Sequence, residues 1–223
     1  MHRILIVDDH IVVRQGLAAI LERSDNTSVA ASIANASGAM EWLKKNDCDM
    51  AILDIAMPDM SGIDLLKQLQ KSKPNLPVLI FSAYPEDQYA VRLIKSGAAG
   101  YLNKECTPEE IMYATNCVLK GKRYLSPAVV EMLTEEVHRP EVQFPHQSLS
   151  NREYQILLLI ASANPPSVIA ERLKLSVKTI GTYRARILQK MQVHSNIELA
   201  HYVLEHNLIY PPANPTINLH PSD

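Results

Sequence analysis

Acidic residues close two of the apolar runs in this sequence. Asp8 and Asp9 follow residues 4–7, and Asp54 follows residues 50–53. If the two runs are neighbouring strands of a parallel sheet, their carboxyl ends lie at one edge and bring the three carboxylates together. Crowded carboxylates repel one another, and a hard divalent cation such as Mg²⁺ relieves that repulsion. The pattern therefore predicts a metal site beside which Asp54 acts as a carboxylate nucleophile toward phosphorus.

Two further polar side chains follow predicted strands. Residues 78–81 lead into Ser82, and residues 100–103 lead into Lys104. A hydroxyl can donate a hydrogen bond to a phosphoryl oxygen, and an ammonium group supplies a point charge. Phosphorylation of Asp54 would add about −1.5 to −2 charge and three acceptor oxygens, drawing Ser82 and Lys104 inward. Tyr101, on the last predicted strand, is expected to swing inward as Ser82 moves.

The first 122 residues alternate short β-branched runs with amphipathic segments of helical length. This alternation predicts an α/β fold with a doubly wound, five-stranded parallel sheet of flavodoxin-like strand order, whose ligands bind beyond the strand carboxyl ends. Thr107 with Glu110 predicts a capped helix start, and Gly97 predicts a helix end. The expected strands are 3–8, 28–33, 49–54, 77–82 and 99–103, and the expected helices are 11–23, 36–46, 61–72, 86–96 and 107–120.

Residues 123–147 have a different pattern. The stretch 128–137 is amphipathic, whereas 139–147 contains two prolines and no hydrophobic period. We expect a linker helix followed by a hinge that leaves the flanking domains free to reorient. Residues 211–223, rich in proline, are expected to be a disordered tail.

Residues 148–210 are predicted to form four short helices. Ser150 with Glu153 forms a capping box before the first, and Ser176 caps a third helix that ends near Met191. The sequence leaves the start of the second helix open, because Pro165 and Pro166 favour different conformations there. Between residues 174 and 190 there are five cations and no acid, which indicates a helix-turn-helix domain facing the phosphates of double-stranded DNA.

Composition narrows the classes of protein that fit. No apolar run reaches the length of a membrane span, and no secretion signal is recognisable, so we expect a cytoplasmic protein without a membrane partner. The net charge is −2, but residues 148–210 carry seven basic and four acidic side chains, so the positive part is C-terminal. The three cysteines are scattered and are expected to be packing thiols.

Residues 1–122 resemble a response-regulator receiver domain with the CheY-like fold. The similarity lies in the acidic pair Asp8-Asp9 and in the segments 53–62, 81–83 and 97–104. It implies that a sensor histidine kinase phosphorylates Asp54. It also implies that Asp9, Asp54 and the backbone carbonyl of Ala56 ligate Mg²⁺ directly, with Asp8 acting through water. Glu105 stands where the family often has proline, and Ser82 replaces threonine but keeps the hydroxyl.

Residues 148–210 are similar to the LuxR-type C-terminal domain, through the segments 149–153, 169–173, 175–180 and 187–193. The whole chain thus resembles a NarL/FixJ-family response regulator, most closely the GacA/UvrY branch. The resemblance implies a DNA-binding transcription regulator rather than an enzyme, and a homodimer when phosphorylated. The expected DNA contacts are Lys178, Thr182, Tyr183, Arg184, Arg186 and Lys190, and the expected dimerisation residues are Ile197, Ala200, Val203 and Leu204. Gly181 and Ala185 offer little side chain to bases, so sparse sequence readout is expected.

Two other classes of protein share part of this pattern. An aspartyl-nucleophile phosphatase would also place a carboxylate at a strand end, but it needs a second acid two residues later, where this chain has Ala56. A small-ligand-sensing LuxR-type regulator would share the C-terminal domain, but its N-terminal half would need an apolar cavity rather than an acidic crevice. Binding of beryllofluoride with Mg²⁺ distinguishes all three.

Overall fold

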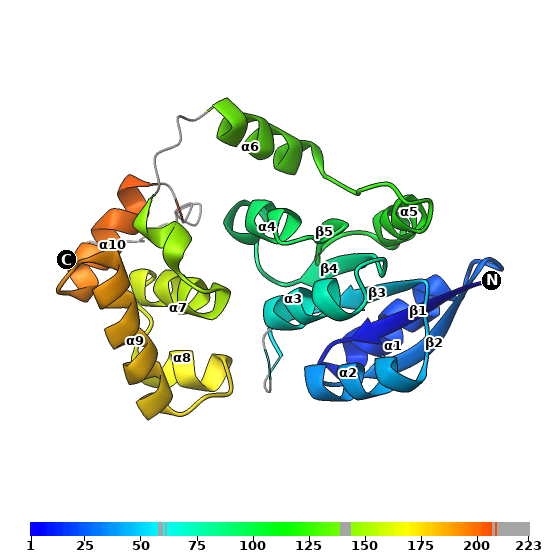
Figure 1. The fold of residues 1–223 in the computed structure, drawn as a ribbon, viewed down its shortest axis with the longest axis horizontal. Helices are drawn as coiled ribbons and strands as arrows, with labels where there is room; N and C mark the ends of the chain where they lie inside the picture. The colour runs from blue at the N-terminus through cyan, green and yellow to red at the C-terminus, as the bar shows by residue number, and fades with distance from the viewer. Residues whose placement is uncertain (58–59, 61, 139–143, 207, 209–223) are drawn as a thin grey trace, which may run out of the picture.

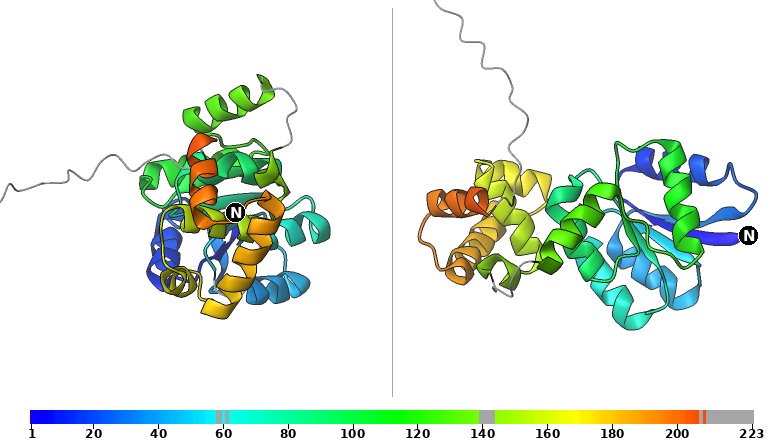
Figure 2. Two further views of the ribbon diagram at one scale, coloured as in Figure 1. Left: turned by 90° about the vertical axis from the view of Figure 1, so that its left-hand side faces the viewer. Right: turned by 90° about the horizontal axis from the view of Figure 1, so that it is seen from above.

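The computed structural model describes residues 1–57, 60, 62–138, 144–206 and 208. They form a larger α/β unit and a smaller helical unit, joined through α6 (Pro127–His138) (Figure 1). Residues 139–143, in the predicted hinge, and residues 211–223, in the predicted tail, lie outside the described residues. Figure 2 shows the two units side by side in a second direction.

Parallel strands in the order β2-β1-β3-β4-β5 form a five-stranded sheet, which confirms the predicted fold class. β1, β3, β4 and β5 are almost continuously buried, as expected of parallel strands covered on both faces, whereas β2 at the edge is partly exposed. The strands are β1 (His2–Val7), β2 (Thr27–Ile33), β3 (Met50–Leu53), β4 (Val78–Ser82) and β5 (Gly100–Asn103).

Helices cover both faces of the sheet. The side chains of Ile4 and Ile6 pack with those of α1 and α5 on one face, whereas Leu5 and Val7 pack with those of α2, α3 and α4 on the other. This division follows from the alternation of side chains along a strand. The helices are α1 (Ile11–Leu21), α2 (Ala36–Lys45), α3 (Gly62–Ser72), α4 (Glu86–Lys95) and α5 (Pro108–Leu119).

The predicted helix signals hold in the structure. Thr107 and Glu110 form a reciprocal capping box at the start of α5. Gly97 follows α4 with φ of +100°, a backbone conformation that L side chains rarely adopt. The predicted linker helix is α6, and it packs against α4: Val129 is buried, and Ser126 Oγ donates a 2.5 Å hydrogen bond to Glu86.

The C-terminal unit begins with a 3₁₀ turn, Pro145–Ser148, and the capping box of Ser150 and Glu153 is present. Pro165 is extended and caps α8, which begins at Pro166, so the two prolines take the two conformations that their order requires. The helices are α7 (Asn151–Ala161), α8 (Pro166–Arg172), α9 (Val177–Met191) and α10 (Asn196–Glu205). We expected the last helix to reach residue 208; it ends at Glu205, and Leu208 N–H turns back to the Val203 carbonyl.

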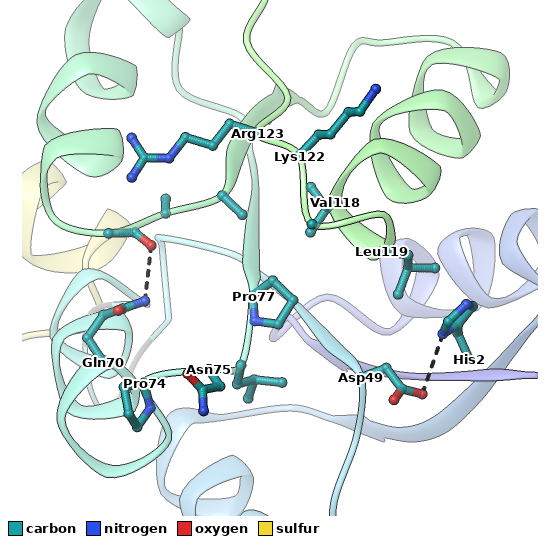
Figure 3. Close-up of a pocket in the computed structure, with 15 residues that line it drawn as sticks. His2, Asp49, Gln70, Pro74, Asn75, Pro77, Val118, Leu119, Lys122 and Arg123 are labelled. Atoms are coloured by element: carbon teal, nitrogen blue, oxygen red, sulfur yellow. Dashed lines mark hydrogen bonds and ion pairs between the residues drawn. The ribbon is translucent and has the colours of Figure 1, made fainter.

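A hollow of about 560 Å³ lies at the amino-terminal edge of the sheet, opposite the acidic residues (Figure 3). His2 pairs with Asp49 at one end, and Gln70 donates to the Gly97 carbonyl at the other. Within the described part of the chain, no helix combines the length and apolar character needed to cross a membrane.

Candidate functional site

The carboxyl ends of three strands meet in one crevice, as the sequence predicted. β1 and β3 are paired with Val7 opposite Leu53, which places Asp8 beside Asp54, and Asp54 N–H donates to the Val7 carbonyl at 2.8 Å. Lys104 follows β5, and its Nζ lies 2.6 Å from Asp8 Oδ2 and 3.0 Å from Asp54 Oδ2. The sheet thus brings together two acids and an ammonium group that are far apart in the sequence.

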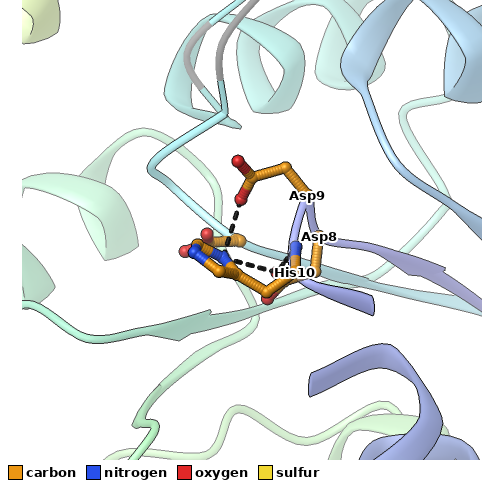
Figure 4. Close-up of side chains that lie close together, drawn as sticks. Asp8, Asp9 and His10 are labelled. Atoms are coloured by element: carbon orange, nitrogen blue, oxygen red, sulfur yellow. Dashed lines mark hydrogen bonds and ion pairs between the residues drawn. The ribbon is translucent and has the colours of Figure 1, made fainter. Parts of the chain in front are cut away.

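Asp9 and His10 complete a cluster of oxygen and nitrogen ligands. His10 Nδ1 lies 2.8 Å from Asp9 Oδ1 and 3.3 Å from Asp8 Oδ1 (Figure 4). One ligand atom from each of Asp8, Asp9, His10 and Asp54 lies within 4.8 Å of the others. Among the described residues, the buried oxygens Asp8 Oδ2, Asp9 Oδ1 and Asp54 Oδ2 accept no hydrogen bond, although cationic groups lie close to them. Such an oxygen-rich set fits a hard divalent cation.

Burial sets the protonation behaviour of this crevice. Desolvation raises the pKa of Asp54; the Lys104 ammonium opposes that rise, and the Asp8 carboxylate adds to it. Burial alone would lower the pKa of Lys104, but the carboxylates of Asp54 and Asp8 outweigh burial and raise it. Asp54 is therefore held beside a charged ammonium in a poorly hydrated site, where a nucleophilic carboxylate oxygen is only partly stabilised.

The loop after Asp54 depends on a glycine. Gly62 N–H donates to the Ile55 carbonyl at 3.1 Å, and a Cβ at position 62 would lie 1.9 Å from the Asp54 carbonyl oxygen. That contact is with backbone, so no side-chain movement could relieve it. Close approach of α3 to the strand end therefore requires glycine at this position.

Ser82 and Tyr101, the predicted switch residues, both connect to Tyr84. Ser82 is buried, and its Oγ accepts the Tyr84 N–H at 3.1 Å. Tyr101 lies inward at 1 % exposure, and its hydroxyl donates to the Tyr84 carbonyl at 2.6 Å. Burial raises the pKa of Tyr101. Sequence reasoning missed Tyr84, because an aromatic residue two positions beyond a strand carries no distinctive signal.

The structure divides the cations of α9 into two groups. Lys178 and Arg186 are exposed, and no hydrogen bond or ion pair of their side chains is found among the described residues. Lys190 Nζ lies 2.6 Å from Glu153 Oε2, and Arg184 Nε donates to Asn196 Oδ1 at 2.7 Å. Thr182 is exposed, with its hydroxyl donating to the Lys178 carbonyl, and Tyr183 is half-buried against the core.

The expected dimerisation residues of α10 also separate by burial. Ile197 and Leu204 are 81 % and 60 % exposed, and Ala200 is half-buried. Val203 is fully buried, because it packs with Leu199 in the core of its own domain. The outward face of α10 therefore consists of Ile197, Ala200 and Leu204, with Val203 beneath it.

Several contacts join the two units near the site. Gln155 Nε2 donates to Tyr84 Oη at 3.0 Å, and the Arg172 guanidinium lies 5.4 Å from the Tyr84 ring centroid. Arg92 of α4 lies 4.7 Å from the Tyr154 ring centroid. Lys174 Nζ pairs with Asp9 Oδ2. The sequence had assigned Lys174 only to the basic surface of the C-terminal domain.

This fold and site define a two-component response regulator with a DNA-binding output domain. Residues 4–116 match the response regulator receiver domain, and residues 147–203 match the bacterial regulatory proteins of the luxR family. The chain therefore belongs to the LuxR-type response regulators, which are DNA-binding transcription regulators.

Relatives and solved structures agree with this membership. The chain is 32% identical to response regulator UvrY of Escherichia coli over 93% of this chain and 96% of that protein. It is 33% identical to response regulator GacA of Pseudomonas aeruginosa, over 94% and 98%. Among solved structures, RcsB of Salmonella enterica serovar Typhimurium, bound to promoter rprA with the phosphomimetic BeF₃⁻, shares the fold with a TM-score of 0.61, 23% identity and coverage of 92% and 99%.

Proposed function

We propose that a sensor histidine kinase phosphorylates Asp54 and that the modified protein binds promoter DNA as a homodimer. The observation that carries the proposal is the position of Asp54: it is buried, 3.0 Å from the Lys104 ammonium, and beside two further carboxylates at the carboxyl edge of the sheet. A structural aspartate at a strand end needs neither the buried lysine nor the companion acids.

In the proposed transfer, an Asp54 carboxylate oxygen attacks phosphorus and the P–N bond of a phosphohistidine breaks. The electron pair of that bond leaves with the kinase imidazole, which takes up a proton, and Asp54 becomes an acyl phosphate. Lys104 would then hold one phosphoryl oxygen, and Ser82 Oγ would donate to another. Asp54 acts as a phosphoacceptor, so the chain needs no general acid of its own at Ala56.

Mg²⁺ would be held by Asp9, Asp54 and the Ala56 carbonyl, with Asp8 acting through water. When bound, the ion neutralises charge on the carboxylate and phosphoryl oxygens. The residues fit this assignment because the three carboxylates offer buried oxygens that accept no hydrogen bond within the described part of the chain.

The DNA-binding step rests on α9. Lys178 and Arg186 are exposed, so we place the primary phosphate contacts there, with Thr182 and Tyr183 near the groove. Arg184 and Lys190 would join them by exchanging Asn196 and Glu153 for DNA phosphates. Exposed Ile197 and Leu204, with Ala200, would form the dimer contact on α10, supported by Val203 beneath. RcsB, which shares the fold, has been solved bound to DNA.

Beryllofluoride binding in the presence of Mg²⁺ tests the phosphoacceptor assignment. The wild-type chain should bind the phosphate mimic, and Asp54→Asn should not, because the attacking carboxylate is gone. Asp49→Asn makes the same chemical change at an exposed acid on the opposite edge of the sheet and should bind like the wild type. Equal binding by the wild type and Asp54→Asn would refute the assignment.

Acetyl phosphate with Mg²⁺ provides a covalent test. The intact mass of the wild-type chain should increase by one phosphoryl group, and that of Asp54→Asn should stay unchanged. Failure of both acetyl phosphate and a histidine-kinase donor would contradict the proposed function.

A further inference from the structure

A lysine of the DNA-binding domain lies in the acidic crevice of the receiver domain. Lys174 follows α8 in the turn before α9, and its Nζ pairs with Asp9 Oδ2. The Asp9 side chain is 6 % exposed, whereas the Lys174 side chain is 52 % exposed. Lys174 therefore reaches in from outside and covers one oxygen of an otherwise enclosed carboxylate.

The local backbone of Lys174 directs this approach. Its φ is +52°, in the left-handed region, and it breaks the chain direction between two helices. Leu175 N–H turns back to the Ala170 carbonyl, and Ser176 caps α9 immediately afterwards. The turn is thus fixed on both sides by helix ends, so the position of Lys174 follows the position of the whole DNA-binding domain.

Other contacts hold the domain in the orientation that places Lys174 there. Gln155 bonds the Tyr84 hydroxyl, Arg172 lies over the Tyr84 ring, and Arg92 donates to the Leu149 carbonyl. These contacts lie on the loop after β4 and on α4, away from Asp9. The ion pair of Lys174 is therefore one part of a docked arrangement with several separate contacts.

Charge balance makes Lys174 a competitor of a divalent cation. Asp8, Asp9 and Asp54 carry three negative charges when ionised, and Lys104 compensates one of them. A divalent cation would match the remaining two. With Lys174 present, the crevice already holds a second positive charge, and that charge occupies an oxygen of Asp9, one of the expected direct ligands.

We propose that Lys174 and Mg²⁺ bind Asp9 in mutual exclusion, so that docking of the DNA-binding domain opposes metal binding and Mg²⁺ promotes undocking before any phosphorylation. This inference rests on the proposed metal site and deepens it. Because the two events are linked thermodynamically, each weakens the other by the same factor. If about nine-tenths of the molecules are docked, the apparent Kd for Mg²⁺ rises about tenfold above its value in the open form.

Calorimetric titration of the full chain with Mg²⁺, without a phosphodonor, tests the exclusion. Lys174→Gln should bind Mg²⁺ several-fold more tightly than the wild type. Lys178→Gln removes the same charge four residues later, at an exposed position, and should match the wild type. Equal Kd values for the wild type and Lys174→Gln would overturn the proposal. So would an equal gain in Lys178→Gln, because that result would reflect net charge alone.

A distance measurement tests the same linkage without relying on a variant at position 174. Spin labels are attached at Glu41→Cys of α2 and Glu171→Cys of α8, both exposed positions, in a chain whose native cysteines are replaced. Mg²⁺ alone should broaden and lengthen the distance distribution; an unchanged distribution at saturating Mg²⁺ would overturn the proposal. Loss of beryllofluoride binding would refute phosphorylation at Asp54 but leave this measurement interpretable, so the two failures are distinguishable.

Discussion

Gln155 of α7 donates a 3.0 Å hydrogen bond to the hydroxyl of Tyr84, two residues beyond Ser82. The backbone of the same tyrosine donates to Ser82 Oγ and accepts from Tyr101, so one residue contacts both predicted switch side chains and the DNA-binding domain. A turn of Ser82 toward a phosphoryl group would withdraw the acceptor of the Tyr84 N–H. Tyr84 therefore provides a direct connection from the phosphorylation site to α7.

Removing only the Tyr84 hydroxyl should weaken docking. Tyr84→Phe keeps the ring beside Tyr89 and Arg172 but leaves Gln155 without its bond, a loss of about 0.5–1.5 kcal/mol that corresponds to about a two- to tenfold rise in the undocked fraction. The interdomain spin-label distances measure this fraction. Tyr113→Phe, at an exposed tyrosine on α5, is the matched control. Identical distributions for Tyr84→Phe and the wild type would exclude this role.

Gly62→Ala should destabilise the receiver domain. The added Cβ would meet the Asp54 carbonyl oxygen at 1.9 Å, and overpacking of this kind costs about 1–3 kcal/mol. Gly16→Ala in α1 is the control, since nothing lies within 4 Å of its added Cβ and alanine favours a helix over glycine. Trp42, the one tryptophan of the chain, reports urea unfolding of this domain by fluorescence. Equal midpoints for Gly62→Ala and wild type would contradict the expected clash.

Asp54→Asn should stabilise the receiver domain at neutral pH without Mg²⁺. Burial raises the pKa of Asp54, so the folded state gains stability below the unfolded pKa and loses it as pH rises through the folded pKa. Asparagine removes this cost, by about 0.5–2 kcal/mol, while Lys104 keeps Asp8 as its partner. The gain should shrink as the pH falls, and Mg²⁺ should stabilise the wild type more than the variant. Trp42 fluorescence in urea measures both effects, and a variant less stable at pH 7 would contradict the sign.

Much of the receiver domain could be predicted from the sequence because its signals are local. Apolar runs, capping residues and terminal acids give the strands, the helices and the edge at which Asp8, Asp54 and Lys104 meet. The Ser150 and Ser176 caps likewise gave the starts of α7 and α9.

The interactions between the two units could not be predicted in this way. Lys174 and Asp9 are 165 residues apart, and neither position carries a pattern that depends on the other. The burial of Val203 and the pairing of Lys190 with Glu153 likewise depend on how helices pack in space. A helical period gives the apolar side of α10, but it does not say which positions on that side face the core.

Glu153→Gln should weaken the C-terminal domain and remove part of its acid sensitivity. Although burial opposes the shift, bonds from Lys190 and Ser150 lower the pKa of Glu153. Its stabilising effect is therefore present above the unfolded pKa and is lost as pH falls through the folded pKa. Replacing it should cost about 1–2 kcal/mol at pH 7, because a charged partner and a helix cap are both weakened. Hydrogen exchange of the α7 amides at pH 7 and near pH 4 measures the change, and an unchanged pH dependence would exclude the ion pair as its source.

Lys178→Ala and Arg186→Ala should each weaken binding to all DNA sequences similarly, because a phosphate contact carries no base information. Each loss should make the logarithmic dependence of affinity on salt shallower by about 0.9 per contact. Lys71→Ala removes an exposed cation from α3 of the receiver domain and should leave the slope unchanged. Fluorescence anisotropy with one specific and one unrelated duplex, from low to physiological salt, measures both quantities. Loss confined to the specific duplex would instead place these side chains on base edges, and an unchanged slope would remove them from the DNA surface.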